Sequence, residues 1–175
     1  MKSSAIEIRI ASYEDAETIA DLSRSTFYDT FSEQNSSRNM ELFLKEQFTH
    51  TRLVSEVGAK GNTFFLAYLG GTLAGYVKLR EGEAPKQFTG QKTLEIARIY
   101  VVKSCIGKGV GHQLMQVSLE TGRERKLDMA WLAVWEHNTR AFNFYSQWGF
   151  EIFGTQVFLL GYDLQKDWLM KKSLK

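Results

Sequence analysis

The alternation of apolar and polar side chains near the start of the chain predicts β-strands. Residues 6–10 (Ile-Glu-Ile-Arg-Ile) alternate with a period of two, as half-buried strands do. Residues 63–69 and 72–79 are two apolar runs, and Gly70 and Gly71 stand between them. Type I′ turns need positive φ at both central positions, which glycine adopts without strain. These two runs are therefore predicted to form a β-hairpin.

Helical spacing follows the first predicted strand. Ser12 and Asp15 have the pattern of a capping box, with a hydroxyl and a carboxylate three residues apart. Apolar residues then recur every three or four positions, which predicts a helix that runs to about Thr30. A second helical pattern covers about residues 37–57, and we expect one helix there.

The rest of the chain alternates between strand and helix patterns after a polar loop. This order of elements is typical of a mixed α/β fold, and we predict a single domain over residues 1–175. The further elements are strands at about residues 93–102, 130–135, 150–159 and 168–174, a helix that follows the glycines at 107–111, and a helix over about 138–147.

Composition excludes several classes of protein. The 175 residues are 43% apolar and 24% charged, which is ordinary for a globular domain. No apolar stretch approaches the roughly 18 residues that cross a bilayer, so no membrane partner is expected. The net charge of +2 is too small to favour nucleic acid. The one cysteine, Cys105, leaves no internal disulfide, which favours a reducing, cytoplasmic location. His50, His112 and His137 have no metal-ligand spacing, so no metal is expected.

A glycine-rich segment, Ile-Gly-Lys-Gly-Val-Gly at residues 106–111, stands between a predicted strand and an amphipathic helix. Glycines allow several main-chain N–H groups to converge on one point, and the helix start adds the positive end of its dipole. No Ser or Thr follows Lys108, as a P-loop requires. The spacing G-x-G-x-G also differs from the dinucleotide fingerprint. The segment predicts a site for another phosphate-containing ligand.

A second motif lies at residues 138–150, which fit N-x-x-A-x-x-F-Y-x-x-x-G-F. Together with residues 94–101 and the glycine segment, it closely resembles the GNAT superfamily of N-acetyltransferases. The resemblance follows the order of elements across most of the chain. It implies a GNAT fold, with a mostly antiparallel seven-stranded sheet that is flanked by about four helices and splayed between the fourth and fifth strands. Because dimers are common in this superfamily, a homodimer is possible.

The same resemblance implies that acetyl-CoA is the cosubstrate. The strand at residues 99–101 would bind the acetyl and pantetheine part through its main chain, and the glycine amides would hold the pyrophosphate. Ile106 stands where the family usually has Gln or Arg, which should lower cofactor affinity modestly. The residues expected to contact acetyl-CoA are Ile99, Tyr100, Val101, Ile106, Gly107, Lys108, Gly109, Val110, Gly111, His112, Asn138 and Arg140.

Tyr145 is the candidate catalytic acid, because the resemblance places it by the thioester sulfur. A tyrosine hydroxyl with a pKa of about 10 is protonated at neutral pH and can give its proton to a departing thiolate. Its alternative role is that of a core aromatic beside Phe142 and Phe144. Cys105 could in principle accept the acetyl group, but no His–Asp pair is evident to activate it, which favours a passive thiol.

Glu95 is the candidate base that deprotonates the incoming amine. It lies on the strand that should line the site, and strand alternation would place it on one face with Ala97 and Ile99. Arg98 and Tyr100 would then lie on the opposite face. A water relay is the alternative, since many relatives carry a carboxylate nearer the position of Ala97.

A narrower resemblance, carried by residues 26–31 and 134–138, is to bacterial spermidine/spermine N-acetyltransferases. It implies that a primary amine, favoured to be a small polyamine, attacks acetyl-CoA directly in a ternary complex. A protein N-terminus, an amino acid or an aminoglycoside remain alternatives. A different class, a non-catalytic acyl-CoA sensor, would not need Tyr145. Candidate acceptor contacts are Phe27, Tyr28, Asp29 and Phe31, with Asp29, Glu33 and Glu41 as partners of a distant ammonium.

Overall fold

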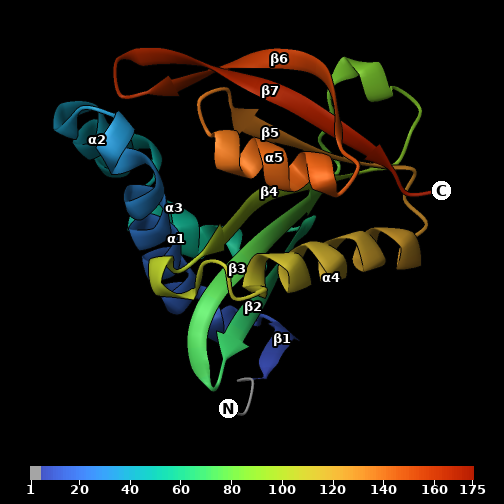
Figure 1. The fold of residues 1–175 in the computed structure, drawn as a ribbon, viewed down its shortest axis with the longest axis horizontal. Coiled ribbons are helices and arrows are strands. Elements are labelled where there is room, and N and C mark those ends of the chain that lie inside the picture. Colours follow the sequence, from blue (N-terminus) through green and yellow to red (C-terminus); the bar gives the residue numbers. More distant parts are fainter. Residues whose placement is uncertain (1–4) are drawn as a thin grey trace.

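The computed structural model describes residues 5–175, which form one seven-stranded mixed sheet in the order β1-β2-β3-β4-β5-β7-β6 (Figure 1). Every neighbouring pair is antiparallel except β4–β5, which is parallel. The predicted seven-stranded, mostly antiparallel fold is confirmed. The strands are β1 (Ile6–Ile10), β2 (Asn62–Leu69), β3 (Thr72–Glu81), β4 (Thr93–Val101), β5 (Met129–Trp135), β6 (Glu151–Leu160) and β7 (Asp163–Ser173).

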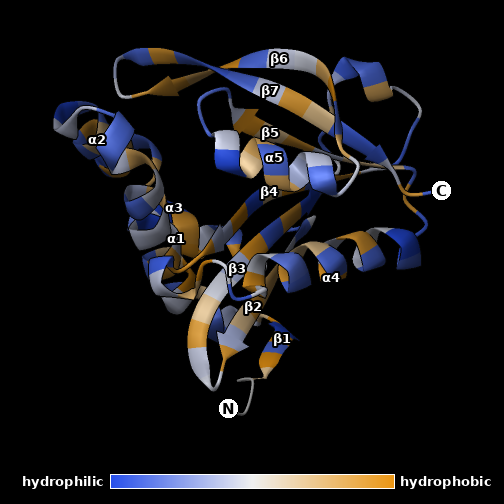
Figure 2. Ribbon diagram, viewed as in Figure 1, coloured by the Kyte–Doolittle hydropathy of each residue, from blue (hydrophilic) through white to orange (hydrophobic). Residues whose placement is uncertain are grey.

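Helices cover both faces of the sheet (Figure 1). The apolar side of α4 packs on one face of the sheet together with residues of α5, while α1 and α3 pack on the other. Alternating apolar and polar segments along α4 are visible in Figure 2 and follow the helical spacing read from the sequence. The helices are α1 (Ala16–Phe31), α2 (Ser37–Leu42), α3 (His50–Glu56), α4 (Val110–Glu124) and α5 (Thr139–Gln147).

The single helix expected over residues 37–57 is wrong. The chain forms α2, a π-helical turn at Phe43–Gln47, and then a separate α3. Thr49 begins α3 as an N-cap, its hydroxyl accepting the N–H of Arg52 at 3.3 Å. The guanidinium of Arg24 on α1 donates to the carbonyls of Leu44 and Phe48, which the irregular turn leaves free. Periodicity alone does not reveal this break, because the apolar spacing continues through it.

The hairpin between β2 and β3 and the end of α5 follow the predicted glycine chemistry. Gly70 and Gly71 both have positive φ, at 58° and 81°. Gly149, with φ of 81°, follows α5 directly, and the N–H of Phe150 returns to the carbonyl of Tyr145 at 3.1 Å. These glycines fix where the neighbouring elements turn.

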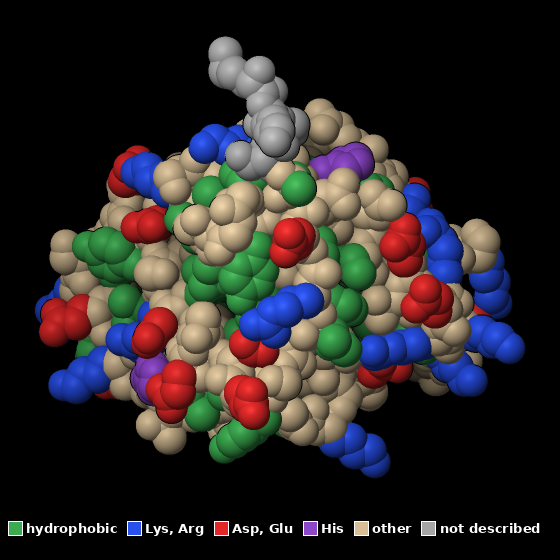
Figure 3. Space-filling model, turned by 90° about the horizontal axis from the view of Figure 1, so that it is seen from below, with side chains coloured by type: hydrophobic (Ala, Val, Ile, Leu, Met, Phe, Trp, Pro, Cys, Tyr) green, Lys and Arg blue, Asp and Glu red, His purple; other side chains and the backbone are tan. Residues whose placement is uncertain are grey.

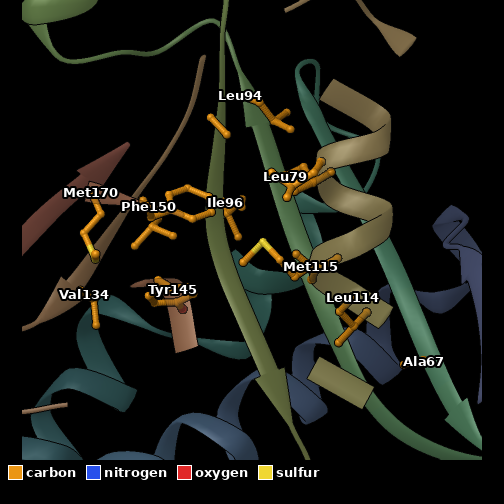
Figure 4. Packing of buried hydrophobic residues seen from close by; sticks show 14 of the residues in the cluster. Ala67, Leu79, Leu94, Ile96, Leu114, Met115, Val134, Tyr145, Phe150 and Met170 are labelled. Carbon is orange, nitrogen blue, oxygen red and sulfur yellow. The ribbon is translucent and has the colours of Figure 1, made fainter. Parts of the chain in front are cut away.

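The largest part of the core lies between the sheet and α4 and α5 (Figure 4). Leu114 and Met115 of α4 are fully buried against the strands. On the α5 side, Tyr145 lies near Val134 and Phe150, as Figure 4 shows. Because protein cores are closely packed, these buried contacts hold the strand ends and α5 in fixed positions around the site described below.

The sheet splays apart between β4 and β5. Their parallel pairing is limited to Thr93–Glu95 of β4 against Met129–Trp131 of β5. Beyond Glu95 and Trp131 the two strands are not paired, so the second half of β4 turns main-chain groups toward an open gap. The predicted splay between the fourth and fifth strands is confirmed.

A β-bulge interrupts β4 at Ala97. Lys78 of β3 is opposite Arg98, but its neighbour Leu79 is opposite Ile96, so Ala97 has no direct partner. A bulge adds one residue to one strand and reverses the alternation of side chains beyond it. The side chains of β4 therefore change faces at this point.

The predicted division of faces along β4 is wrong because of this bulge. Glu95 lies on the α1 side of the sheet with Arg98 and Tyr100, since these residues pair with β3 side chains of that face. Ile99 instead packs into the core beneath α4. Strand alternation read from sequence had placed Glu95 and Ile99 together.

Figure 3 shows the face that carries the N-terminal end of the described chain, with basic and acidic side chains interspersed between small apolar areas. This mixture agrees with the small net charge. Within residues 5–175, none of the helices combines the length and apolar character that crossing a membrane requires.

Candidate active site

A cavity of about 800 Å³ occupies the splay between β4 and β5. Its walls come from the second half of β4, the end of β5, the C-terminal part of α1, the glycine segment before α4, and α5. Segments that are far apart in the sequence thus meet at the gap in the sheet. The cavity joins the predicted phosphate site at one end to the predicted acceptor residues at the other.

The glycine segment forms one end of the cavity. Gly107 and Gly109 have positive φ, at 80° and 86°, which the sequence predicted for a loop of converging amides. The N–H groups of Val110, Gly111 and His112 begin α4 and have no intrahelical acceptor. They lie at the N-terminus of α4, which is the positive end of the helix dipole, so this end of the cavity suits an anion.

The predicted cofactor residues of this segment divide into two groups. Ile106, Gly107, Gly109, Gly111 and His112 line the cavity. The two others do not: the side chain of Val110 is buried in the core, and Lys108 lies outside the lining. The main-chain N–H of Val110, in the first turn of α4, remains available to a phosphate, whereas that of Lys108 donates to the carbonyl of Cys105 at 3.3 Å.

Replacing Gly107 with alanine should raise the KM for acetyl-CoA by about fivefold, because positive φ costs an L-residue 1–2 kcal/mol and relaxation would turn the amides away. Steady-state kinetics with varied acetyl-CoA measure this effect. Gly71→Ala is the matched control, since Gly71 has nearly the same φ and equally open surroundings in the distant β2–β3 turn. Equal KM values in the two variants would contradict the role of Gly107.

The second half of β4 and the start of α5 form the middle of the cavity. Ile99, Tyr100 and Val101, which are predicted to bind the acetyl and pantetheine part, line it along the strand edge that β5 leaves unpaired. Asn138 and Arg140, at the start of α5, line it from the side of β5. The Oδ1 atom of Asn138 also caps α5 by accepting the N–H of Ala141 at 3.2 Å, which leaves its amide NH₂ available to a ligand.

Tyr145 of α5 lies at the centre of this wall. Its side chain is 8% exposed and lines the cavity, with its ring 5.5 Å from that of Phe144 and 6.2 Å from that of Phe150. Within residues 5–175 its hydroxyl has no hydrogen-bond partner. Burial raises the pKa of this hydroxyl above its usual value, so it keeps its proton throughout the neutral range. The two roles predicted for Tyr145, core aromatic and cavity group, are compatible in this position.

Glu95 is not brought into the cavity. Its carboxylate is buried and accepts a hydrogen bond from Nε of Arg80 at 2.6 Å. It is absent from the residues that line the cavity. The ion pair with Arg80 occupies Glu95, and the geometry therefore does not support it as the base.

The predicted acceptor residues are also divided. Asp29 and Phe31 line the cavity, whereas Phe27 is buried against other aromatic rings of α1 and the π-helical turn. Tyr28 is half exposed and lines a separate hollow together with Glu41. Helical geometry explains the division, because successive residues of α1 point in different directions.

Glu33 and Lys103 stand at the mouth of the cavity, where the Nζ–Oε1 distance between them is 3.7 Å. Both side chains are largely exposed. Asp29 and Glu33 therefore supply two carboxylates to the cavity lining, and Lys103 partly offsets their charge.

Trp135 and Arg98 also line the cavity, although neither was among the predicted site residues. Trp135, at the end of β5, packs edge-on against Phe31 with ring centroids 6.0 Å apart, and Phe31 lies 6.5 Å from Tyr100. Arg98 also lines the cavity, while its guanidinium is held by the carboxylate of Glu56 on α3 at 2.6 and 3.0 Å. The position of Trp135 at the end of a strand next to the splay is the signal that could have identified it.

Comparison with known proteins identifies the family to which this chain belongs. The Acetyltransferase (GNAT) family matches residues 17–150. An uncharacterised N-acetyltransferase of Lactobacillus delbrueckii subsp. lactis is 41% identical over 153 residues, which cover 87% of this chain and 88% of that protein. The spermidine N(1)-acetyltransferase of Thermoplasma acidophilum is 24% identical over 152 residues, covering 85% and 89%.

Among solved structures, the PaiA N-acetyltransferase of Thermoplasma acidophilum in complex with coenzyme A superposes with a TM-score of 0.77 at 24% identity. The match covers 97% of this chain and 99% of that one. The fold is therefore that of an N-acetyltransferase. The chain belongs to the GNAT family of acetyltransferases, and the prediction of an acetyl-CoA-dependent N-acetyltransferase is confirmed at the level of the family.

Proposed function

We propose that this enzyme transfers the acetyl group of acetyl-CoA to a primary amine of a small polyamine, by direct attack in a ternary complex. The observation that carries the proposal is that one cavity is lined by Tyr145, by the glycine segment, and by the carboxylate residues Asp29 and Glu33. Partial similarity to a spermidine acetyltransferase agrees with this acceptor class.

The described residues fit acetyl-CoA. The free N–H groups of the first turn of α4 suit the pyrophosphate, and the unpaired edge of β4 offers amide partners to the pantetheine arm. Asn138 and Arg140 stand on the opposite wall, where an amide and a guanidinium could bind the arm and a phosphate. When bound, acetyl-CoA supplies the activated acyl group.

The chemistry required of the chain is proton transfer and charge stabilisation. The hydroxyl of Tyr145 donates its proton to the departing sulfur, since its raised pKa keeps it protonated. A main-chain N–H near Val101 stabilises the negative charge on the carbonyl oxygen as the amine attacks. The amine itself must lose a proton first, because an ammonium has no lone pair.

The acceptor class is tested by measuring CoA release with spermidine, spermine, amino acids, peptides and aminoglycosides, with the acetylated product identified by mass spectrometry. We expect the highest kcat/KM with a polyamine. A higher kcat/KM with a peptide or an amino acid would contradict the polyamine assignment and leave the acetyltransferase activity in place.

Neutralising the acidic mouth in the double variant Asp29→Asn, Glu33→Gln should raise the KM for spermidine by about fivefold, because two exposed carboxylates each attract a distant ammonium weakly. The kcat should not change, and the effect should shrink at high salt. Steady-state kinetics at two ionic strengths measure both effects. Glu41→Gln is the control, because Glu41 lines the separate hollow. A similar rise in the control would exclude a local ammonium site.

A further inference from the structure

Two carboxylates are buried within residues 5–175, and only one of them has an ionic partner. Glu95 is paired with Arg80, as described above. Asp167 of β7 is 7% exposed and forms no ion pair with another described residue. Its hydrogen bond comes from the Nε2 amide of Gln156 on β6, at 3.3 Å. An unpaired carboxylate is costly to bury, so this position favours the arrival of a cation or a proton.

The sheet register places Asp167 beside the acceptor end of the cavity. Asp167 is directly opposite Trp135 of β5, and paired residues of antiparallel strands point to the same face. Trp135 lines the cavity and packs against Phe31 of α1. The carboxylate of Asp167 therefore lies on the α1 side of the sheet, next to Trp135. Asp167 is not itself among the residues that line the cavity, so a water molecule beside Trp135 must connect the two.

The charge of Asp167 also acts on Tyr100, a residue of β4 that lines the cavity. The pKa of Tyr100 is raised first by burial, then by the neighbouring Tyr76 and Tyr145, and also by the charge of Asp167. Tyr100 belongs to β4 and Asp167 to the opposite arm, so the two groups face each other across the splay.

We propose that Asp167 accepts the proton of the incoming ammonium, through one water molecule that reaches it past Trp135. This inference rests on the proposed function and assigns the base that Glu95 does not supply. The proton moves from nitrogen to the carboxylate of Asp167, and the freed lone pair forms the N–C bond. The C–S bond breaks and the sulfur takes the proton of Tyr145. The phenolate takes the second proton from nitrogen, and Asp167 releases its own to solvent.

The surroundings of Asp167 favour the protonated form of its carboxyl group more than water does. Burial raises the pKa of Asp167 above its usual 3.8, although the hydrogen bond from Gln156 lowers it. On β5 it faces Trp135 and across the splay the protonated Tyr100, neither of which carries a charge. The next residue, Lys166, points to the other face and binds Glu136 at 2.7 Å. A base must be unprotonated, so activity falls as pH drops through this raised pKa.

The test is Asp167→Asn, which keeps the shape of the side chain and an acceptor for Gln156. We expect kcat/KM for spermidine to fall by about 100-fold, with unchanged affinity for CoA and loss of the acidic limb of the pH profile. Asp163→Asn, an exposed position of the same strand, is the matched control and should keep both rate and profile. Retention of the acidic limb in Asp167→Asn, or its loss in Glu95→Gln instead, would overturn the proposal.

A second measurement separates this inference from the proposed function. If the wild type acetylates none of the amines, the proposed function fails, and Asp167 is then judged by carbon-13 NMR titration of its carboxyl group. With CoA present, the pKa should lie above 3.8 and should decrease when spermidine is added, because a nearby ammonium favours the carboxylate. A pKa that does not respond to spermidine would overturn the assignment.

Discussion

Tyr145→Phe is expected to lower kcat by about 100-fold and to leave the KM for acetyl-CoA nearly unchanged, because the lost group acts only when the sulfur departs. Phenylalanine keeps the ring contacts with Phe144 and Phe150. The hydroxyl has no partner within residues 5–175, so its removal should leave thermal stability unchanged. Steady-state kinetics and a melting curve measure the two parts of this expectation.

Cys105→Ala provides the control for the route of acyl transfer. Cys105 is buried and is not among the residues that line the cavity. Its replacement should therefore leave kcat unchanged. Normal kcat in Tyr145→Phe together with loss of activity in Cys105→Ala would contradict direct transfer and indicate an acetyl-cysteine intermediate.

Glu56→Gln should lower the free energy of unfolding by about 3 kcal/mol, because it leaves the buried Lys78 and the largely buried Arg98 without their partly buried carboxylate partner. The carboxylate of Glu56 holds Arg98 at 2.6 Å and Nζ of Lys78 at 3.1 Å, and the side chain of Lys78 is 5% exposed. Urea denaturation at pH 7 measures the change. Glu136→Gln, which breaks a more exposed pair with Lys166, should cost under about 1 kcal/mol.

The pH dependence of Glu56→Gln follows from the same contacts. Burial alone would raise the pKa of Glu56, but the hydrogen bond and charge of Arg98 and then Lys78 outweigh burial and lower it. A lowered pKa stabilises the fold above the usual value of 4.5, and this stabilisation is lost as pH falls through the lowered pKa. The difference between wild type and variant should therefore shrink below pH 4.5. A constant difference across this range would contradict the ion-pair account.

The order of elements was predictable because each depends on local chemistry. The hairpin at Gly70 and Gly71 and the helix end at Gly149 need positive φ, and the glycines in the sequence indicate these positions. Amphipathic spacing found α1 and α4 in the same way. The π-helical turn at Phe43–Gln47 was not predictable, because Arg24 from a distant helix satisfies its carbonyls.

The cofactor half of the site was easier to predict than the acceptor half. The glycine segment and the residues from Asn138 to Tyr145 are contiguous motifs, and each carries most of its geometry in its own sequence. The acceptor end combines α1, β4, β5 and β7, whose relative positions depend on tertiary packing. The bulge at Ala97 changed the face of Glu95, and the position of Asp167 beside Trp135 follows from the register of β5 and β7.

The central claim, direct acetyl transfer to an amine, is tested most directly by mass spectrometry with isotope-labelled acetyl-CoA. The enzyme is incubated with labelled acetyl-CoA, first alone and then with spermidine. The masses of the intact protein and of the small molecules are then measured. We expect an unmodified protein in both samples and labelled acetylspermidine, equal in amount to the CoA released, in the second. A labelled protein that passes its acetyl group to the amine, or tight binding of acetyl-CoA with no acetylated amine, would contradict this account.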